Sequence, residues 1–158
     1  MERRFPGKEF MPIAIDVGKK KIVLIGGGRI ALQKVEVLMR YTNNLHIVAP
    51  EVCRSIKVKG VSYIEKKYEL SDLDDAFIVY ACTNISDLNR TVAEDCRDRN
   101  ILINVVDNPA MCDFVTPAIY KKDYVSIAVT SNAQSVLKSI EVRNKIKNFL
   151  ENDPIPVL

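Results

Sequence analysis

Three glycines occur together near the start of the chain, in the stretch "KIVLIGGGRIALQK" at residues 21–34. Gly26, Gly28 and Ala31 match the spacing G-x-G-x-x-[GA], after an apolar run typical of a strand and before a helical pattern. In that context the first glycine permits a tight turn and the second lets a pyrophosphate approach the backbone, while the small third residue lets the helix pack closely on the strand. The spacing therefore predicts a dinucleotide site, with a glycine turn that binds nothing as the alternative.

Two charged residues near this motif are candidates for contacts with the dinucleotide. Arg29 opens the predicted helix, whose unpaired N-terminal amides favour an anion, so we expect it near the phosphates. Glu51 follows the next predicted strand, with Pro50 between them, and is the candidate carboxylate for the ribose 2′-hydroxyl that distinguishes NAD from NADP. The sequence favours NAD as the cofactor and leaves NADP open.

A carboxylate follows the last strand of the predicted sheet, in "NVVDNP" at residues 104–109. Because open α/β sheets bind ligands at the carboxyl ends of their strands, Asp107 is expected to face the cofactor crevice. There a carboxylate can act as a general base. The alternative is a loop-capping aspartate before an Asn-Pro turn. The single histidine, His46, lies within an apolar run and does not compete for this role.

Apolar runs alternate with helical patterns over the first two thirds of the chain. Strands are expected at 21–25, 45–50, 61–68, 76–83 and 101–107, and helices at 29–40 and 86–100, the last with Ser86 as its N-cap. The run at 61–68 alternates, as an edge strand does. Alternation of strands with helices predicts βαβ units and a parallel sheet. The expected fold class is α/β, with a Rossmann-like parallel sheet.

The pattern changes after Pro109. Residues 114–130 predict two strands around Lys-Lys-Asp, and residues 135–152 predict a basic helix. We therefore expect an NAD-binding domain at 1–113 and a small α+β region at 114–158. This second region is too small to bury a core of its own, so it must pack on the first domain or on a second copy of the chain.

Composition narrows the classes of function. The chain has 158 residues, of which 47% are hydrophobic and 27% charged, and its net charge of +3 gives no support for a nucleic-acid partner. No apolar run reaches the length that spans a bilayer, and "MERRFPGKEF" lacks the apolar region of a secretory signal. The cysteines fit reduced thiols in a cytoplasmic protein and show no metal-binding spacing: Cys53, Cys82, Cys96 and Cys112.

The chain resembles the precorrin-2 dehydrogenase family, which forms the N-terminal part of siroheme synthases. The resemblance covers roughly residues 11–150 and rests on "GGGRIALQK", "VAPE", "ACTNISDLN", "NVVDNPAMCDFVTPAI" and "VSIAVTSNAQSVL…VRNKI" in the family's order and spacing. It implies NAD-dependent oxidation of precorrin-2 to sirohydrochlorin in siroheme biosynthesis. It also implies a homodimer formed through the second region, and Asp107 as the acid/base residue. Some members of the family are also ferrochelatases, and the sequence leaves that activity open.

The resemblance extends to the residues that contact cofactor and substrate. Arg29, Ile30 and the loop at Glu51 match the family's cofactor-contacting positions, and Thr83 and Asn104, from two of the matching blocks, complete the expected set. The implied substrate is an anionic tetrapyrrole, which needs cations. Lysines and arginines of the second region supply them, unless they form only a solvated face: Lys121, Lys122, Lys138, Arg143 and Lys145. The expected substrate-binding residues are Ser131, Lys138 and Arg143.

The chain departs from the family pattern beside the expected substrate. "TSNAQSVL" has Asn132, Ala133 and Val136 where relatives have small or proline residues, and Asn84 stands where an aspartate is common. Two other functions therefore stay open: an NAD-sensing regulatory module, and a paralogue that keeps the fold but has lost catalysis.

Overall fold

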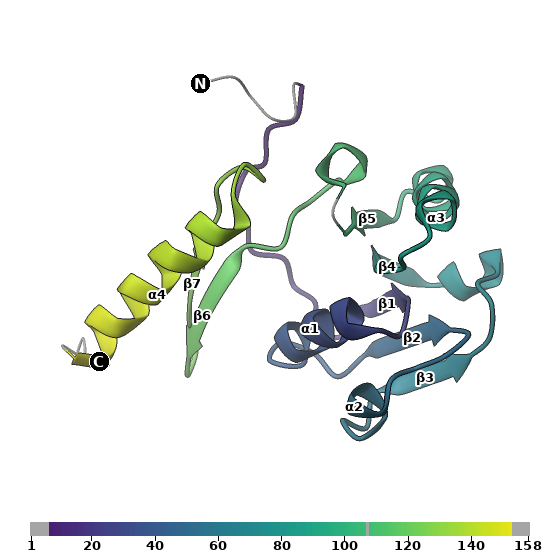
Figure 1. The fold of residues 1–158 in the computed structure, drawn as a ribbon, viewed down its shortest axis with the longest axis horizontal. Coiled ribbons are helices and arrows are strands. Elements are labelled where there is room, and N and C mark those ends of the chain that lie inside the picture. The colour runs from purple at the N-terminus through teal and green to yellow at the C-terminus, as the bar shows by residue number, and fades with distance from the viewer. Residues whose placement is uncertain (1–6, 107, 153–158) are drawn as a thin grey trace. The chain divides into compact units, whose positions relative to one another are not determined.

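The computed structural model describes residues 7–106 and 108–152, which form two compact units (Figure 1). The sheet unit comprises Ala14–Phe114, and the helix–hairpin unit comprises the described residues from 115 onward together with residues 7–13. The contacts thus group residues 7–13 with the C-terminal segment, whereas the domain predicted from the sequence, 1–113, included them with the sheet.

The sheet unit contains five strands in the order β3-β2-β1-β4-β5. Their bounds are β1 (Lys21–Ile25), β2 (Leu45–Ala49), β3 (Ser62–Glu65), β4 (Ala76–Ala81) and β5 (Leu102–Val105). Every neighbouring pair is parallel, and β3 lies at an edge, which confirms the predicted α/β class. The chain runs outward from β1 to β3 and then resumes on the other side of β1 with β4. The strand order therefore reverses between β1 and β4, where such sheets bind their ligands.

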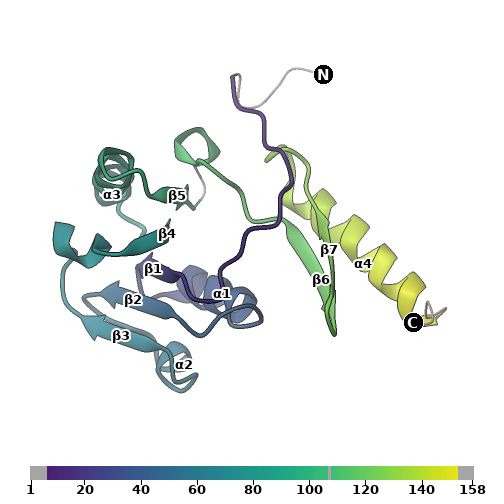
Figure 2. The ribbon, with the colours of Figure 1, turned by 180° about the vertical axis from the view of Figure 1, so that it is seen from behind.

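Helices α1 (Arg29–Leu38), α2 (Arg54–Lys57) and α3 (Ser86–Asp98) connect these strands, together with the short 3₁₀ turn η1 (Leu70–Leu73). A second 3₁₀ turn, η2 (Pro109–Met111), follows β5. Figure 2 shows the same connections from behind. The prediction of Ser86 as the N-cap of α3 was wrong, because Ile85 occupies that position. The hydroxyl of Thr83 accepts a hydrogen bond from the Ile85 amide at 3.1 Å, so the turn into the helix is stabilised before Ser86.

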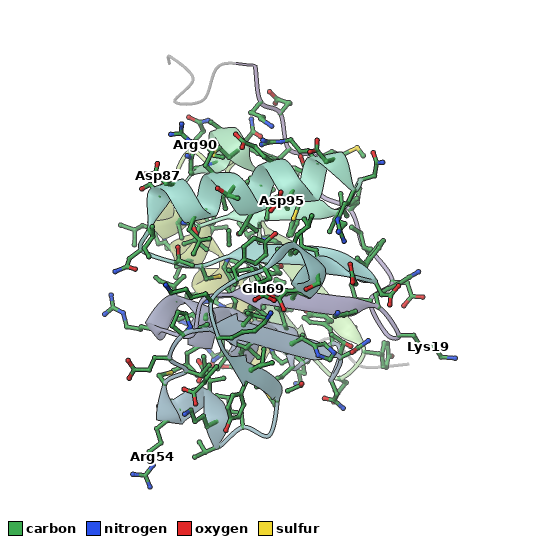
Figure 3. All side chains as sticks on the ribbon, turned by 90° about the vertical axis from the view of Figure 1, so that its right-hand side faces the viewer. Lys19, Arg54, Glu69, Asp87, Arg90 and Asp95 are labelled. Carbon is green, nitrogen blue, oxygen red and sulfur yellow. The ribbon has the colours of Figure 1, made fainter. Side chains whose placement is uncertain are left out.

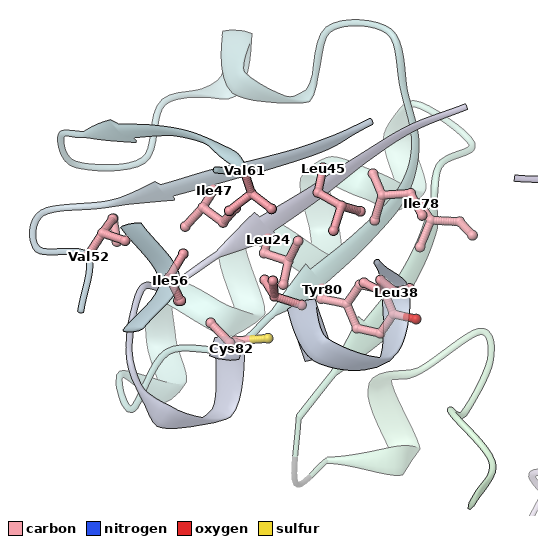
Figure 4. Close-up of a cluster of buried hydrophobic side chains, with 14 residues drawn as sticks. Leu24, Leu38, Leu45, Ile47, Val52, Ile56, Val61, Ile78, Tyr80 and Cys82 are labelled. Atoms are coloured by element: carbon pink, nitrogen blue, oxygen red, sulfur yellow. The ribbon is translucent and has the colours of Figure 1, made fainter. Parts of the chain in front are cut away.

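The core of the sheet unit lies between the sheet and its helices. Figure 4 shows the cluster that α1 and α2 form with one face, in which Leu24, Leu45 and Ile47 are fully buried. Each such side chain contributes about 1.5–3 kcal/mol through removal from water. Helix α3 packs on β4 and β5 and buries Val92 and Cys96. The central strands β1, β2 and β4 are buried along most of their length, so a ligand approaches them at their ends.

All four cysteines are free thiols, in agreement with the prediction. Within residues 7–106 and 108–152, no group of three or more metal-binding side chains comes together. In the same part of the chain, no helix has the length and apolar character required to cross a bilayer.

The helix–hairpin unit consists of β6 (Ala118–Lys122), β7 (Val125–Val129) and α4 (Val136–Asn152). The two strands and the helix were predicted; the strands pair antiparallel, and α4 packs on both. Arg143 of α4 donates a hydrogen bond to the carbonyl of Ile119 at 2.9 Å. The amide of Phe10 donates to the Asn132 side chain at 2.7 Å, which ties the N-terminal segment to the loop before α4.

That loop carries backbone strain. Asn132 and Ala133 have φ angles of 52° and 59°, in the left-handed region. Asparagine tolerates this conformation, whereas the β-carbon of alanine is crowded there.

We predict that Ala133→Gly raises the free energy of unfolding by about 0.5–1 kcal/mol, because relief of the left-handed strain exceeds the entropy that glycine adds to the unfolded chain. Ala128→Gly, in strand β7, is the matched control and should lower stability. Chemical denaturation of both variants measures the difference. Equal destabilisation by the two substitutions would contradict the claim that Ala133 is strained.

Candidate dinucleotide site

A tight glycine turn follows β1. Gly26 has a φ of 123°, a conformation that residues with a β-carbon rarely adopt. A β-carbon on Gly26 would lie 2.8 Å from the carbonyl oxygen of Cys82 and 3.2 Å from the amide nitrogen of Thr83. The turn therefore lies directly against the loop that follows β4.

The middle glycine is equally constrained. A β-carbon on Gly27 would collide with the carbonyl oxygen of Glu51 and lie 2.8 Å from Cα of Val52. The Cys53 amide donates a hydrogen bond to the Gly27 carbonyl at 2.9 Å. The glycine turn is thus held between the loop after β2 and the loop after β4. Spacing alone missed Gly27, because the G-x-G pattern accepts any residue at that position.

Gly28 differs from both neighbours. It is exposed, its φ of −90° suits any residue, and a β-carbon there would meet no heavy atom of the described chain within 4 Å. It also occupies the N-cap of α1, where serine, threonine or aspartate would stabilise the helix more. The fold itself therefore gives no reason for a glycine. A ligand phosphate approaching the amides of α1 gives one, so this position fits the predicted pyrophosphate.

The side chains around Gly28 lie as the motif requires. Arg29 is exposed at the first position of α1. Ala31 is fully buried in the core cluster, which allows α1 to approach the sheet, and Ile30 packs at the edge of that cluster. Arg29 can therefore reach an anion at the helix terminus, while Ala31 serves packing.

The loop after β2 is held in place by a carboxylate from β3. Glu65 accepts a hydrogen bond from the Val52 amide at 3.0 Å and two from the Lys57 ammonium at 2.9 Å. The Val52 amide, and next the Lys57 ammonium, hold the pKa of the Glu65 carboxyl below its usual range. Glu51 is exposed in the same loop. Glu51 was predicted from the sequence and Glu65 was not, since only the register of β2 with β3 brings Glu65 beside Ala49.

The loop after β4 is held by Asn89 from α3. The Asn89 carbonyl oxygen accepts hydrogen bonds from the Thr83 hydroxyl at 2.7 Å and the Thr83 amide at 3.3 Å. Its amide group donates to the Thr83 carbonyl at 3.0 Å. Thr83 thus lies beside the glycine turn, and its hydroxyl is engaged within the chain. Asn89 is buried and was not identified from the sequence.

The end of β5 is organised by its own polar network. Asn104 is buried and donates a hydrogen bond to the carbonyl of Phe114 at 2.9 Å. The Val106 amide donates to the Ala81 carbonyl at 3.0 Å, so the end of β5 lies beside the end of β4. Asp107, the predicted acid/base residue, lies outside the described residues.

The residues predicted to bind substrate lie in the helix–hairpin unit. The Ser131 hydroxyl donates to the Ser135 carbonyl at 2.8 Å and accepts from the Ser135 amide at 3.0 Å, which stabilises the start of α4. Lys138 forms an exposed ion pair with Glu141 at 3.2 Å. Arg143 lies further along α4 and binds the Ile119 carbonyl. Each residue therefore has a partner within its own unit, and the three are spread along the helix and the loop before it.

The fold and the glycine turn define a dinucleotide-binding α/β protein, and comparison with known families agrees. Residues 13–118 match the family model NAD_binding_7, described as "Putative NAD(P)-binding". The chain is 29% identical to a siroheme synthase of Buchnera aphidicola over 147 residues, which are 90% of the chain and 31% of that protein. It is 31% identical to a siroheme synthase of Saccharophagus degradans over 146 residues, which are 90% of the chain and 32% of that protein.

A solved structure shows the same fold. The structure of "SirC, precorrin-2 dehydrogenase" superposes with a TM-score of 0.77 at 21% identity, covering 89% of this chain and 70% of that one. This chain therefore belongs to the NAD(P)-binding family that the model over residues 13–118 describes. It spans about a third of the length of the siroheme synthases that it matches.

We predict that Gly28→Asp has opposite effects on stability and on NAD binding. Aspartate at the N-cap should stabilise α1, by up to about 1 kcal/mol, because its side chain accepts an N-terminal amide. The same carboxylate should repel the pyrophosphate and weaken NAD binding at least tenfold.

Thermal unfolding and calorimetric titration with NAD measure the two effects. Gly27→Ala is the control: it should destabilise the unit, because its β-carbon collides with Glu51. Unchanged NAD affinity in a folded Gly28→Asp protein would place the cofactor elsewhere.

Proposed function

We propose that this chain binds NAD at the glycine turn and catalyses the oxidation of precorrin-2 to sirohydrochlorin, a cytoplasmic step of siroheme biosynthesis. The observation that carries the binding is the open position at Gly28, next to the point where the strand order reverses. Membership of the NAD(P)-binding family supports the cofactor, and the siroheme synthases among the relatives support the substrate.

The residues of the turn bind and orient the cofactor. Gly28 and the first amides of α1 bind the pyrophosphate, and the Arg29 guanidinium adds a charge-assisted hydrogen bond. The exposed carboxylate of Glu51 accepts a hydrogen bond from the 2′-hydroxyl of the adenosine ribose. The same carboxylate would repel the 2′-phosphate of NADP, which favours NAD as the cofactor. When bound, NAD supplies the hydride acceptor.

Oxidation of the macrocycle also releases a proton, and the chain must accept it. Asp107 follows Val106, whose backbone is bound to the end of β4. A carboxylate at this strand end can take the proton as the hydride leaves. If the chain also inserts ferrous iron, the same carboxylate would accept protons that the pyrrole nitrogens must lose.

The substrate carries many carboxylates, and the helix–hairpin unit offers cations to bind them. Lys138 and Arg143 of α4 contribute two, and Ser131 contributes a hydroxyl before the helix, which would exchange the Ser135 carbonyl for a substrate carboxylate. Because the ion pair of Lys138 with Glu141 is exposed, a substrate carboxylate can replace this partner at little cost.

We predict that Asp107→Ala lowers the oxidation rate by roughly 10²–10⁴-fold, the range for loss of a general acid or base, with NAD affinity nearly unchanged. Single-turnover oxidation of precorrin-2 at saturating NAD, followed by sirohydrochlorin absorbance, measures the rate. Asp98→Ala, which removes an exposed carboxylate at the end of α3, is the control and should leave the rate unchanged.

A rate for Asp107→Ala within about threefold of the parent would remove Asp107 from the mechanism. If the parent itself binds NAD but forms no sirohydrochlorin, the chain is instead an NAD-sensing module or an inactive paralogue.

The helix–hairpin unit also exposes apolar side chains that a second copy would cover. On α4, Leu137 is 80% exposed, Val136 71% and Phe149 64%, and Tyr124 at the β6–β7 turn is 74% exposed. Such a surface on a small unit fits a closed two-fold dimer. We propose that the chain forms a homodimer through this unit.

We predict a dimer by light scattering at micromolar concentration, and a monomer for Leu137→Asp, because a buried carboxylate would face the partner copy. The control is Val58→Asp, which changes an equally exposed apolar residue, 73% accessible, on the sheet unit. A parent protein that is monomeric at high micromolar concentration would contradict the proposal.

A further inference from the structure

An apolar side chain stands exposed beside the glycine turn. Ile85 follows β4, occupies the N-cap of α3, and is 56% exposed. The other strongly exposed apolar residues of the sheet unit that follow β1 lie elsewhere, on or next to α2, β3 and η1: Val58, Tyr63, Ile64 and Leu70. Among these side chains, Ile85 alone belongs to a loop that touches the glycine turn.

The backbone beneath Ile85 is held firmly. Its amide donates to the Thr83 hydroxyl at 3.1 Å, and that hydroxyl lies 3.2 Å from the Ile85 carbonyl. The buried Asn89 holds Thr83 through three hydrogen bonds, two accepted and one donated. The loop of residues 83–85 is therefore fixed through a side chain of α3, and the isoleucine is presented to solvent in a set position. Figure 3 shows α3 through the labelled Asp87, Arg90 and Asp95, which follow this loop.

Contacts with the glycine turn locate this loop relative to the cofactor. Gly26 approaches the backbone of Cys82 and Thr83 so closely that no β-carbon fits between them. On its other side, the turn contacts the loop that carries Glu51. A dinucleotide whose pyrophosphate lies at Gly28 and whose ribose reaches Glu51 must place its adenine near these two loops. The flat, largely apolar adenine ring needs an apolar surface there, and the loop of residues 83–85 provides one in Ile85.

We propose that Ile85 forms the apolar platform for the adenine ring, and that Asn89 is the positioning residue that holds this platform beside the glycine turn. The inference rests on the dinucleotide binding proposed above and adds the residue that supplies affinity for the adenine half. It accounts for an exposed isoleucine at a helix N-cap, where a small polar residue would be better for the helix. It also accounts for the buried Asn89, whose side chain forms three hydrogen bonds with Thr83 in that loop.

The test is calorimetric titration of the full chain with NAD, ADP-ribose and nicotinamide mononucleotide, the last of which lacks adenine. Ile85→Ser should weaken NAD and ADP-ribose about tenfold, because the ring face loses its apolar contact, and should leave the mononucleotide unchanged. Ile85→Leu, which keeps the apolar surface, should bind all three ligands like the parent. Since Ile85 is exposed, Ile85→Leu should retain the thermal stability of the parent, and Ile85→Ser should equal or exceed it, because serine is the better N-cap.

Asn89→Asp tests the positioning role, because it keeps the shape of the side chain but loses the hydrogen bond donated to the Thr83 carbonyl. It should also weaken ADP-ribose selectively. A parent that binds neither NAD nor ADP-ribose would refute the proposed function itself. A parent that binds NAD, with Ile85→Ser retaining ADP-ribose affinity within twofold, would overturn only the platform. Equal weakening of the affinity for all three ligands by Ile85→Ser would likewise overturn the platform.

Discussion

The structure of the site depends on the close approach of one backbone turn to two loops. Gly26 touches the backbone at Cys82, and Gly27 touches the backbone at Glu51, at distances that admit no β-carbon. These contacts bring the ends of β1, β2 and β4 to one place on the sheet. They also leave Gly28, the third glycine of the run, facing open space at the start of α1. Two glycines therefore build the turn, and the third leaves it accessible to a phosphate.

The two flanking loops are fixed by side chains from outside them. Glu65 of β3 holds the loop after β2, and Asn89 of α3 holds the loop after β4. Each is a hydrogen-bonding group that satisfies backbone amides or carbonyls which would otherwise be free to rearrange. A binding surface made of loops gains precision when such groups hold it before the ligand arrives, because less ordering entropy is lost on binding.

Much of this arrangement followed from the sequence, because it depends on local patterns. Apolar runs and helical spacing predicted the strands and the helices α1, α3 and α4 to within a few residues, but not the short helix α2, and the glycine spacing predicted the turn. Glu65 and Asn89 could not be found in this way, since their roles depend on strand register and on helix docking rather than on neighbours in the chain. The prediction of Ser86 as the N-cap also failed because of a contact that the pattern does not show. The Thr83 hydroxyl accepts a hydrogen bond from the Ile85 amide, and the helix begins with Ile85 as its N-cap.

The central claim is that a dinucleotide binds where the strand order reverses, between β1 and β4. Amide hydrogen exchange of the whole chain, with and without saturating NAD, tests it most directly. The account predicts slower exchange in three segments: residues 26–30, 51–53 and 83–86. The alternative binding place is a cavity of about 480 Å³ at the amino ends of the strands, on the opposite side from the glycine turn. It is lined by Lys19, Lys20, Lys21 and Phe77 among others. Protection centred on residues 19–21 and 75–77, with the glycine turn unaffected, would contradict the account.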